Sequence, residues 1–162
     1  MRDLELYGQI VAFDLDGTLY RGSHEPIEGA VKRVAEITRH GCNRAIIVTA
    51  NTGHDPAIRD NLQRDFPSIS PQDIYWACGS EKPQIAYGAK AAFYVDNCYE
   101  ICITAVQLGM LGVYMGDYDA IRYYSRVPIK AQWAIQILPN WESRRFDEIF
   151  TQRTLYESGV FL

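Results

Sequence analysis

The chain has 162 residues, of which 48% are hydrophobic and 22% charged, and its formal net charge is −4. This length and composition predict one soluble domain with a full core, and the acidic balance argues against tight non-specific binding to nucleic acid. No apolar run approaches the roughly 20 residues that span a bilayer, and the polar N-terminus lacks a signal-peptide pattern, so we expect a cytoplasmic protein with no membrane partner.

Five short apolar runs recur along the chain, and each predicts a strand that is buried on both faces. They lie at residues 10–13, 45–48, 74–77, 91–95 and 111–115. Apolar residues at helical spacing predict helices between them, at 28–40, 55–66 and 98–109. A last strand is expected within 132–138 and a closing helix within 142–151.

This alternation of strands and helices predicts an α/β protein with a three-layer Rossmann-like fold and a mainly parallel central sheet. We expect residues 1–162 to form a single domain, with an irregular or peripheral segment at 118–138 and a C-terminal tail at 152–162. In such folds, ligands bind beyond the carboxyl ends of the strands, near the point where the strand order reverses.

Residues suited to phosphate and metal chemistry follow the predicted strands. In chain order they are Asp14 and Asp16, then Thr49, Ala50 and Asn51, then Lys82 in the loop SEKP, then Asp96 and Asn97. Clustered carboxylates repel one another unless a cation lies among them, and a few oxygen ligands with room for a phosphate favour Mg²⁺. A hydroxyl and a lysine suit phosphate oxygens.

The two aspartates after the first strand are separated by one leucine. Side chains two apart on a strand point to the same side, so we expect Asp14 and Asp16 to reach one small site. Gly17 allows the chain to turn immediately afterwards. One aspartate could then attack phosphorus, and the other could move a proton.

The order DLDGT, VTAN, KP and YVDN resembles the four signature motifs of the haloacid dehalogenase (HAD) superfamily of phosphohydrolases, over roughly residues 8–116. The resemblance implies that Asp14 is a nucleophile that forms an aspartyl-phosphate and that Asp16 is the acid/base. It implies that Mg²⁺ is held by the side chains of Asp14 and Asp96 and the carbonyl of Asp16. Thr49 and Lys82 match the phosphate-binding positions of the family.

Two features depart from the family pattern. Asn97 stands where many members carry a second acid, and Glu100 is a weaker substitute within the next helical turn. Lys82 lies only 14 residues before Asp96, which is a shorter interval than usual, so Lys90 is the reserve candidate for the active-site lysine.

The intervals between the motifs have no room for a folded cap domain, so the resemblance implies a capless enzyme with an open site. Such a site suits macromolecular ends, phosphoproteins, or small molecules if a homo-oligomer closes it. The segment 121–133 interleaves basic and aromatic residues, which could bind phosphates and bases, although a peripheral basic face is the simpler interpretation. Nucleic acid is therefore a partner that we do not favour.

A Mg²⁺-dependent phosphatase is the leading hypothesis. The alternatives are a weakly active or inactive phosphate-binding or regulatory module, motivated by Asn97, and a nucleotide or polynucleotide end phosphatase. A phosphoacceptor receiver is disfavoured because no aspartate ends the third predicted strand. We interpret His54 as a surface or capping residue, and Cys98 and Cys102 as half-buried apolar residues and not zinc ligands.

Overall fold

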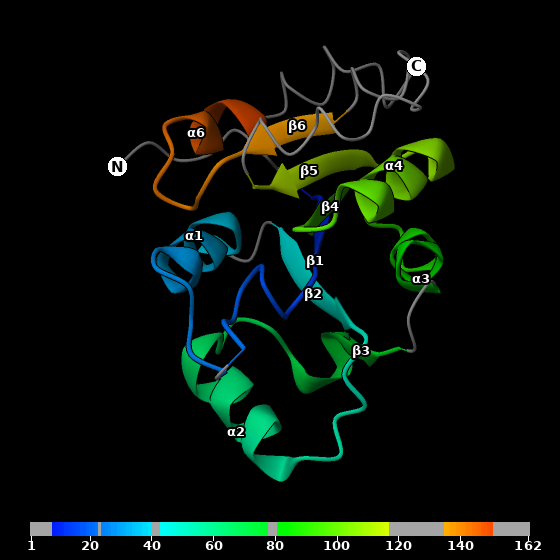
Figure 1. Ribbon diagram of the computed structural model, residues 1–162. Helices are drawn as coiled ribbons and strands as arrows, with labels where there is room; N and C mark the ends of the chain where they lie inside the picture. The colour runs from blue at the N-terminus through cyan, green and yellow to red at the C-terminus, as the bar shows by residue number, and fades with distance from the viewer. Residues whose placement is uncertain (1–7, 23, 40–42, 78–80, 117–134, 151–162) are drawn as a thin grey trace.

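The computed structural model of the chain describes residues 8–22, 24–39, 43–77, 81–116 and 135–150. Its six strands form one sheet in the order β3-β2-β1-β4-β5-β6. Every neighbouring pair of strands is parallel, and the strand order reverses between β1 and β4. The predicted Rossmann-like α/β fold is therefore confirmed (Figure 1).

All six predicted strands are present in the sheet. They are β1 (Ile10–Phe13), β2 (Arg44–Thr49), β3 (Ile74–Trp76), β4 (Phe93–Asp96), β5 (Leu111–Met115) and β6 (Ile135–Leu138). The strand β6 lies within the segment expected to be irregular, of which residues 118–134 are outside the described part of the chain, as is the expected tail at 152–162.

The helices cover the two faces of the sheet. In the described part of the chain they are α1 (Ala30–Ile37), α2 (Pro56–Asp65), α3 (Lys82–Gly88), α4 (Tyr99–Leu108) and α6 (Arg145–Ile149), together with the 3-10 turn η2 (Pro71–Asp73). In Figure 1, α1, α2 and α6 lie on one side of the sheet, and α3 and α4 lie on the other. None of the described helices is long and apolar enough to cross a membrane.

Alternate strand residues pack against opposite helical layers. Phe13 belongs to the cluster that includes Val34 of α1 and Leu62 of α2. Ala12 belongs to the cluster that includes Ala86 of α3 and Ala105 of α4. Because both faces are covered, both sets of strand side chains are apolar, which explains the continuous apolar runs.

The structure corrects one predicted helix and adds one that the sequence analysis missed. The closing helix is shorter than 142–151 within the described residues, because side chains of Asn140 and Ser143 first bond backbone N–H groups at 142 and 145 and form a turn. The helix α3 was not predicted, because it has seven residues and ends in Ala-Tyr-Gly rather than in a long apolar period.

Candidate active site

The chain turns sharply as soon as β1 ends. The carbonyl of Leu15 accepts hydrogen bonds from the N–H groups of residues 18, 19 and 20, at 3.2, 2.9 and 3.0 Å. Gly17 has a φ of 82°, and a Cβ at that position would lie 2.2 Å from the Asn97 side chain. Glycine is therefore required at position 17, and Asn97 packs directly against this turn.

The two aspartates of the turn have different environments. Asp14 is only 5% exposed, whereas Asp16 is exposed. The expectation that strand alternation aligns them was wrong in its premise, because β1 ends at Phe13 and both aspartates lie in the turn beyond it. Asp14 is thus a buried carboxylate, and Asp16 is open to solvent.

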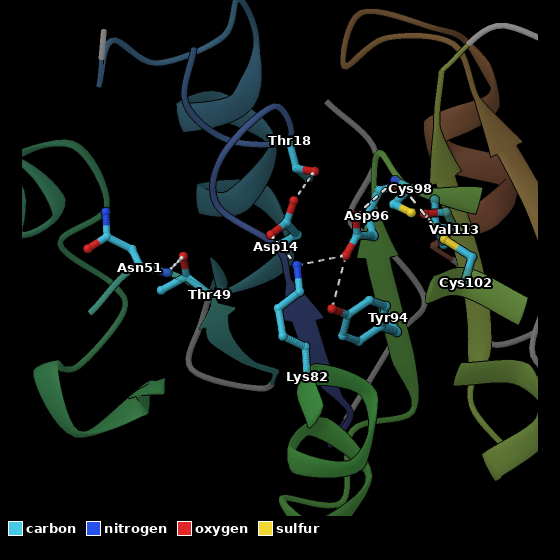
Figure 2. Close-up of polar contacts among 10 residues, drawn as sticks. All are labelled: Asp14, Thr18, Thr49, Asn51, Lys82, Tyr94, Asp96, Cys98, Cys102 and Val113. Carbon is cyan, nitrogen blue, oxygen red and sulfur yellow. Dashed lines mark hydrogen bonds and ion pairs between the residues drawn. The ribbon is translucent and has the colours of Figure 1, made fainter. Parts of the chain in front are cut away.

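Three buried charged groups meet where the strand order reverses, and we call Asp14, Lys82 and Asp96 the charge centre. The Lys82 Nζ lies 2.9 Å from Asp14 Oδ1 and 3.3 Å from Asp96 Oδ2 (Figure 2). Lys82 is 6% exposed and Asp96 is 1% exposed. Buried charges persist only when they are paired, and two carboxylates with one ammonium leave one negative charge that a cation can balance.

Further donors hold the two carboxylates in place. Thr18 Oγ1 donates to Asp14 Oδ2 at 3.1 Å, and Tyr94 OH donates to Asp96 Oδ2 at 3.0 Å (Figure 2). The backbone N–H of Cys98 donates to Asp96 Oδ1 at 2.8 Å. Sequence reasoning missed Thr18 and Tyr94. The period of two along a strand could have found Tyr94, because it lies two residues before Asp96.

Lys82 is the first residue of α3 and not part of a loop as predicted. Pro83 follows it, and proline near a helix start is favourable because the missing N–H needs no partner there. The reserve candidate Lys90 lies beyond the other end of α3 and is exposed. The structure therefore places Lys82, and not Lys90, beside the two carboxylates.

Burial and charge shift the pKa values of this centre. Burial, and then the negative charge of Asp96, raises the pKa of Asp14 to about 6, although Lys82 acts in the opposite direction. Burial lowers the pKa of Lys82, but the charges of Asp96 and Asp14 outweigh it, so the net shift is upward. The pKa of Tyr94 is raised by burial and by Asp96, so its hydroxyl stays protonated and keeps donating.

The predicted phosphate-binding residues lie at the end of β2, next to β1 in the sheet. Thr49 is buried, and its Oγ1 accepts a hydrogen bond from the Asn51 N–H at 3.1 Å. The Asn51 side chain in turn accepts from the Gly53 N–H at 2.8 Å. Ala50 and His54 are exposed. Because parallel strands share one carboxyl edge, these residues lie on the same edge of the sheet as Asp14.

Trp141, from the loop between β6 and α6, also supports the turn after β1. Its Nε1–H donates to the carbonyl of Thr18 at 2.8 Å, and its ring lies 6.0 Å from that of Phe13. Its own carbonyl accepts from Arg33 Nε at 2.7 Å. No local pattern predicts this support, because the hydrogen bond joins residues 123 positions apart in the sequence.

The donor set fits Mg²⁺, which is commonly bound by one or two carboxylates together with waters and phosphate oxygens. Asp14 and Asp96 supply two buried carboxylates around one ammonium, and the exposed Asn97 and Glu100 are nearby in sequence. Among the described residues there is no group of three or more His, Cys, Asp or Glu side chains that could hold a metal.

Comparisons with known proteins support the fold. No protein-family model matches this chain, and a search of curated proteins found no match. A similar solved structure is the UDP-GlcNAc 2-epimerase from Neisseria meningitidis bound to UDP-GlcNAc, with a TM-score of 0.59 and 16% identity. The match covers 99% of this chain and 38% of that chain. At this identity the likeness shows a shared Rossmann-like α/β architecture.

Proposed function

We propose that the protein is a Mg²⁺-dependent phosphomonoester hydrolase of the HAD type, acting through an aspartyl-phosphate on Asp14. The observation that carries this proposal is the charge centre, in which Lys82 bridges Asp14 and Asp96 where the strand order reverses. The motif resemblance independently assigns a nucleophile, a lysine and a metal ligand to these three positions.

The proposed reaction has two displacements at phosphorus. An Asp14 oxygen attacks phosphorus, the bond to the leaving oxygen breaks, and Asp16 donates a proton to that oxygen. Asp16 then takes a proton from a water molecule, whose oxygen attacks phosphorus and regenerates the Asp14 carboxylate. The exposure of Asp16 suits this exchange with leaving group and water. Thr18 and Lys82 keep the Asp14 carboxylate oriented throughout.

Lys82 and the proposed Mg²⁺ ion would both serve to bring an anionic phosphate close to a carboxylate. Lys82 offsets the charge of Asp14, and Thr49, with Ala50 and Asn51 after it, would bind phosphate oxygens. The Mg²⁺ ion, held by Asp14, Asp96 and the carbonyl of Asp16, would supply the remaining positive charge. Dinucleotide-binding folds of this strand order instead have a glycine-rich turn after the first strand, and the carboxylates at this turn would repel a pyrophosphate without a cation.

The test is hydrolysis of p-nitrophenyl phosphate with Mg²⁺ or with EDTA. We expect Mg²⁺-dependent turnover in the wild type, and a kcat at least about a thousandfold lower in Asp14→Asn, because the amide is nearly isosteric but not nucleophilic. Asp60→Asn is the matched control, since Asp60 is exposed on α2. Circular dichroism checks that each variant is folded.

Full activity in Asp14→Asn would refute the mechanism. Absence of turnover in the wild type, together with binding of inorganic phosphate, would favour the alternative of a phosphate-binding or regulatory module. Recovery of turnover in Asn97→Asp would then show that the missing second acid limits the metal site. The nucleotide or polynucleotide alternative depends on residues 121–133, which lie outside the described part of the chain.

A further inference from the structure

A second cationic group lies on the same edge of the sheet as the charge centre, and we call Gly53, Arg59 and Trp76 the Arg59 flank. Trp76 is the last residue of β3 and pairs in register with Thr49. The next N–H, that of Ala77, donates to the Thr49 carbonyl at 2.7 Å. The flank therefore adjoins the strand end at which the proposed phosphate site lies.

The guanidinium of Arg59 is held in place by two contacts. Its Nε–H donates to the Gly53 carbonyl at 2.9 Å, and its central carbon lies 4.6 Å from the centroid of the Trp76 ring. A Cβ at Gly53 would lie 2.6 Å from that ring and 2.8 Å from an Arg59 Nη. An arginine fixed by an aromatic face and a carbonyl loses little conformational freedom when it binds a ligand.

The outer nitrogens of Arg59 remain available for an anion. Four other arginines, Arg33, Arg44, Arg64 and Arg145, each pair with a carboxylate. Arg59 makes no such pair with any residue in the described part of the chain, and its side chain is exposed. Its planar fork of donors matches the geometry of a carboxylate or a phosphate.

The flank is connected by hydrogen bonds to the proposed phosphate site. The Gly53 residue that accepts from Arg59 also donates to Asn51, and Asn51 donates to Thr49. One short loop therefore contains both the proposed phosphate-binding residues and Gly53, whose carbonyl accepts the hydrogen bond from Arg59. A substrate whose phosphate contacts Thr49 would extend its leaving group from this edge, with the Arg59 flank as one wall.

We propose that Arg59 binds a second anionic group, a carboxylate or a phosphate, on the substrate's leaving group. The favoured substrates would then be phosphomonoesters that carry a second anion, and Arg59 would determine that specificity. This inference rests on the proposed phosphatase function, which supplies the first phosphate site.

The experiment compares ligands that differ in the second anion. The first pair is glycerol 3-phosphate and 3-phosphoglycerate, and the second, with a longer reach, is adenosine 5′-monophosphate and adenosine 3′,5′-bisphosphate. Binding with Mg²⁺ is measured by calorimetry in the Asp14→Asn background, so that it does not depend on turnover. We expect the doubly anionic member of at least one pair to bind about tenfold more tightly, as one charge-assisted hydrogen-bonded pair implies.

Arg59→Gln should bring that ratio of dissociation constants close to one. Arg64→Gln is the matched control, because Arg64 is an exposed arginine of the same helix that pairs with Asp65, and it should keep the ratio. If Arg59 only supports the loop, both members of a pair weaken alike and the ratio survives, which would overturn the proposal.

The outcomes separate this inference from the phosphatase proposal. If the Asp14→Asn protein binds the two members of each ligand pair equally well, the inference is overturned, even if the wild type hydrolyses p-nitrophenyl phosphate. A preference that disappears in Arg59→Gln would support the anion site even if no substrate is hydrolysed, and only the phosphatase proposal would then fail.

Discussion

The charge centre and the Arg59 flank each contain one cationic side chain on the same edge of the same sheet, but their environments are opposite. Lys82 is buried and bridges two carboxylates, whereas Arg59 is exposed and lies on an aromatic ring. Burial demands that charges be neutralised by protein groups, and exposure leaves this to solvent or ligand. In the proposed enzyme, the buried centre would therefore carry out the chemistry, and the exposed Arg59 would recognise the substrate.

Removing the buried cation should have the largest effect on stability. In Lys82→Met, Asp14 and Asp96 lose their shared ammonium, and we expect the free energy of unfolding to fall by about 3–5 kcal/mol at pH 7.5, because two buried carboxylates would then have no positive charge beside them. Urea denaturation in EDTA measures it. Lys90→Met, an exposed lysine beyond the same helix, should change stability by less than about 0.5 kcal/mol.

If the free energy of unfolding fell by less than about 1 kcal/mol in Lys82→Met, the ion pairs of Lys82 with Asp14 and Asp96 would not stabilise the fold as proposed. The double variant Lys82→Met/Asp14→Asn tests whether the lost stability comes from the unbalanced carboxylates. It should recover part of the lost stability, because only one buried carboxylate, that of Asp96, then has no positive charge beside it.

The pH dependence of stability should identify Asp14 as a destabilising charge in the metal-free protein. Its native pKa of about 6 exceeds the ordinary value of 3.8, so the native state binds this proton more tightly than the unfolded state. The resulting stabilisation is complete below pH 3.8 and is lost as the pH rises through about 6. A shift of this size corresponds to at most about 3 kcal/mol.

Urea denaturation of the wild type and of Asp14→Asn in EDTA, between pH 4 and 7.5, isolates this contribution as the difference between the two proteins. The wild type should lose stability relative to the variant as the pH rises. A difference that stays constant across the range would show that Asp14 titrates normally.

The smallest expected effect is in the Arg59 flank. Gly53→Ala places a Cβ at a φ of 67° and against the Trp76 ring, so we expect the free energy of unfolding to fall by about 1–2 kcal/mol. The preference for doubly anionic ligands should fall as well. Gly88→Ala is the control, since a Cβ there meets nothing within 4 Å. Unchanged stability and ligand preference in Gly53→Ala would mean that the flank is not rigid.

Local patterns in the sequence were enough to predict most of the architecture. Continuous apolar runs marked the first five strands, because strands buried on both faces need apolar residues on both sides. The positions of Asp14, Lys82 and Asp96 between those runs predicted that they share one edge, because parallel strands end on the same side. The chemistry assigned to them remains a prediction.

Only the tertiary structure decided how each polar group is surrounded. The strand pattern predicted that Asp14 and Asp16 point to the same side, yet β1 ends at Phe13, and Asp14 is buried whereas Asp16 is exposed. The support that Trp141 gives to Thr18, and the contact of Arg59 with Trp76, join residues 123 and 17 positions apart. Burial and such long-range contacts depend on how the helices pack on the sheet. They determine whether an ionisable side chain is paired within the protein or exposed to solvent, which residue type alone does not.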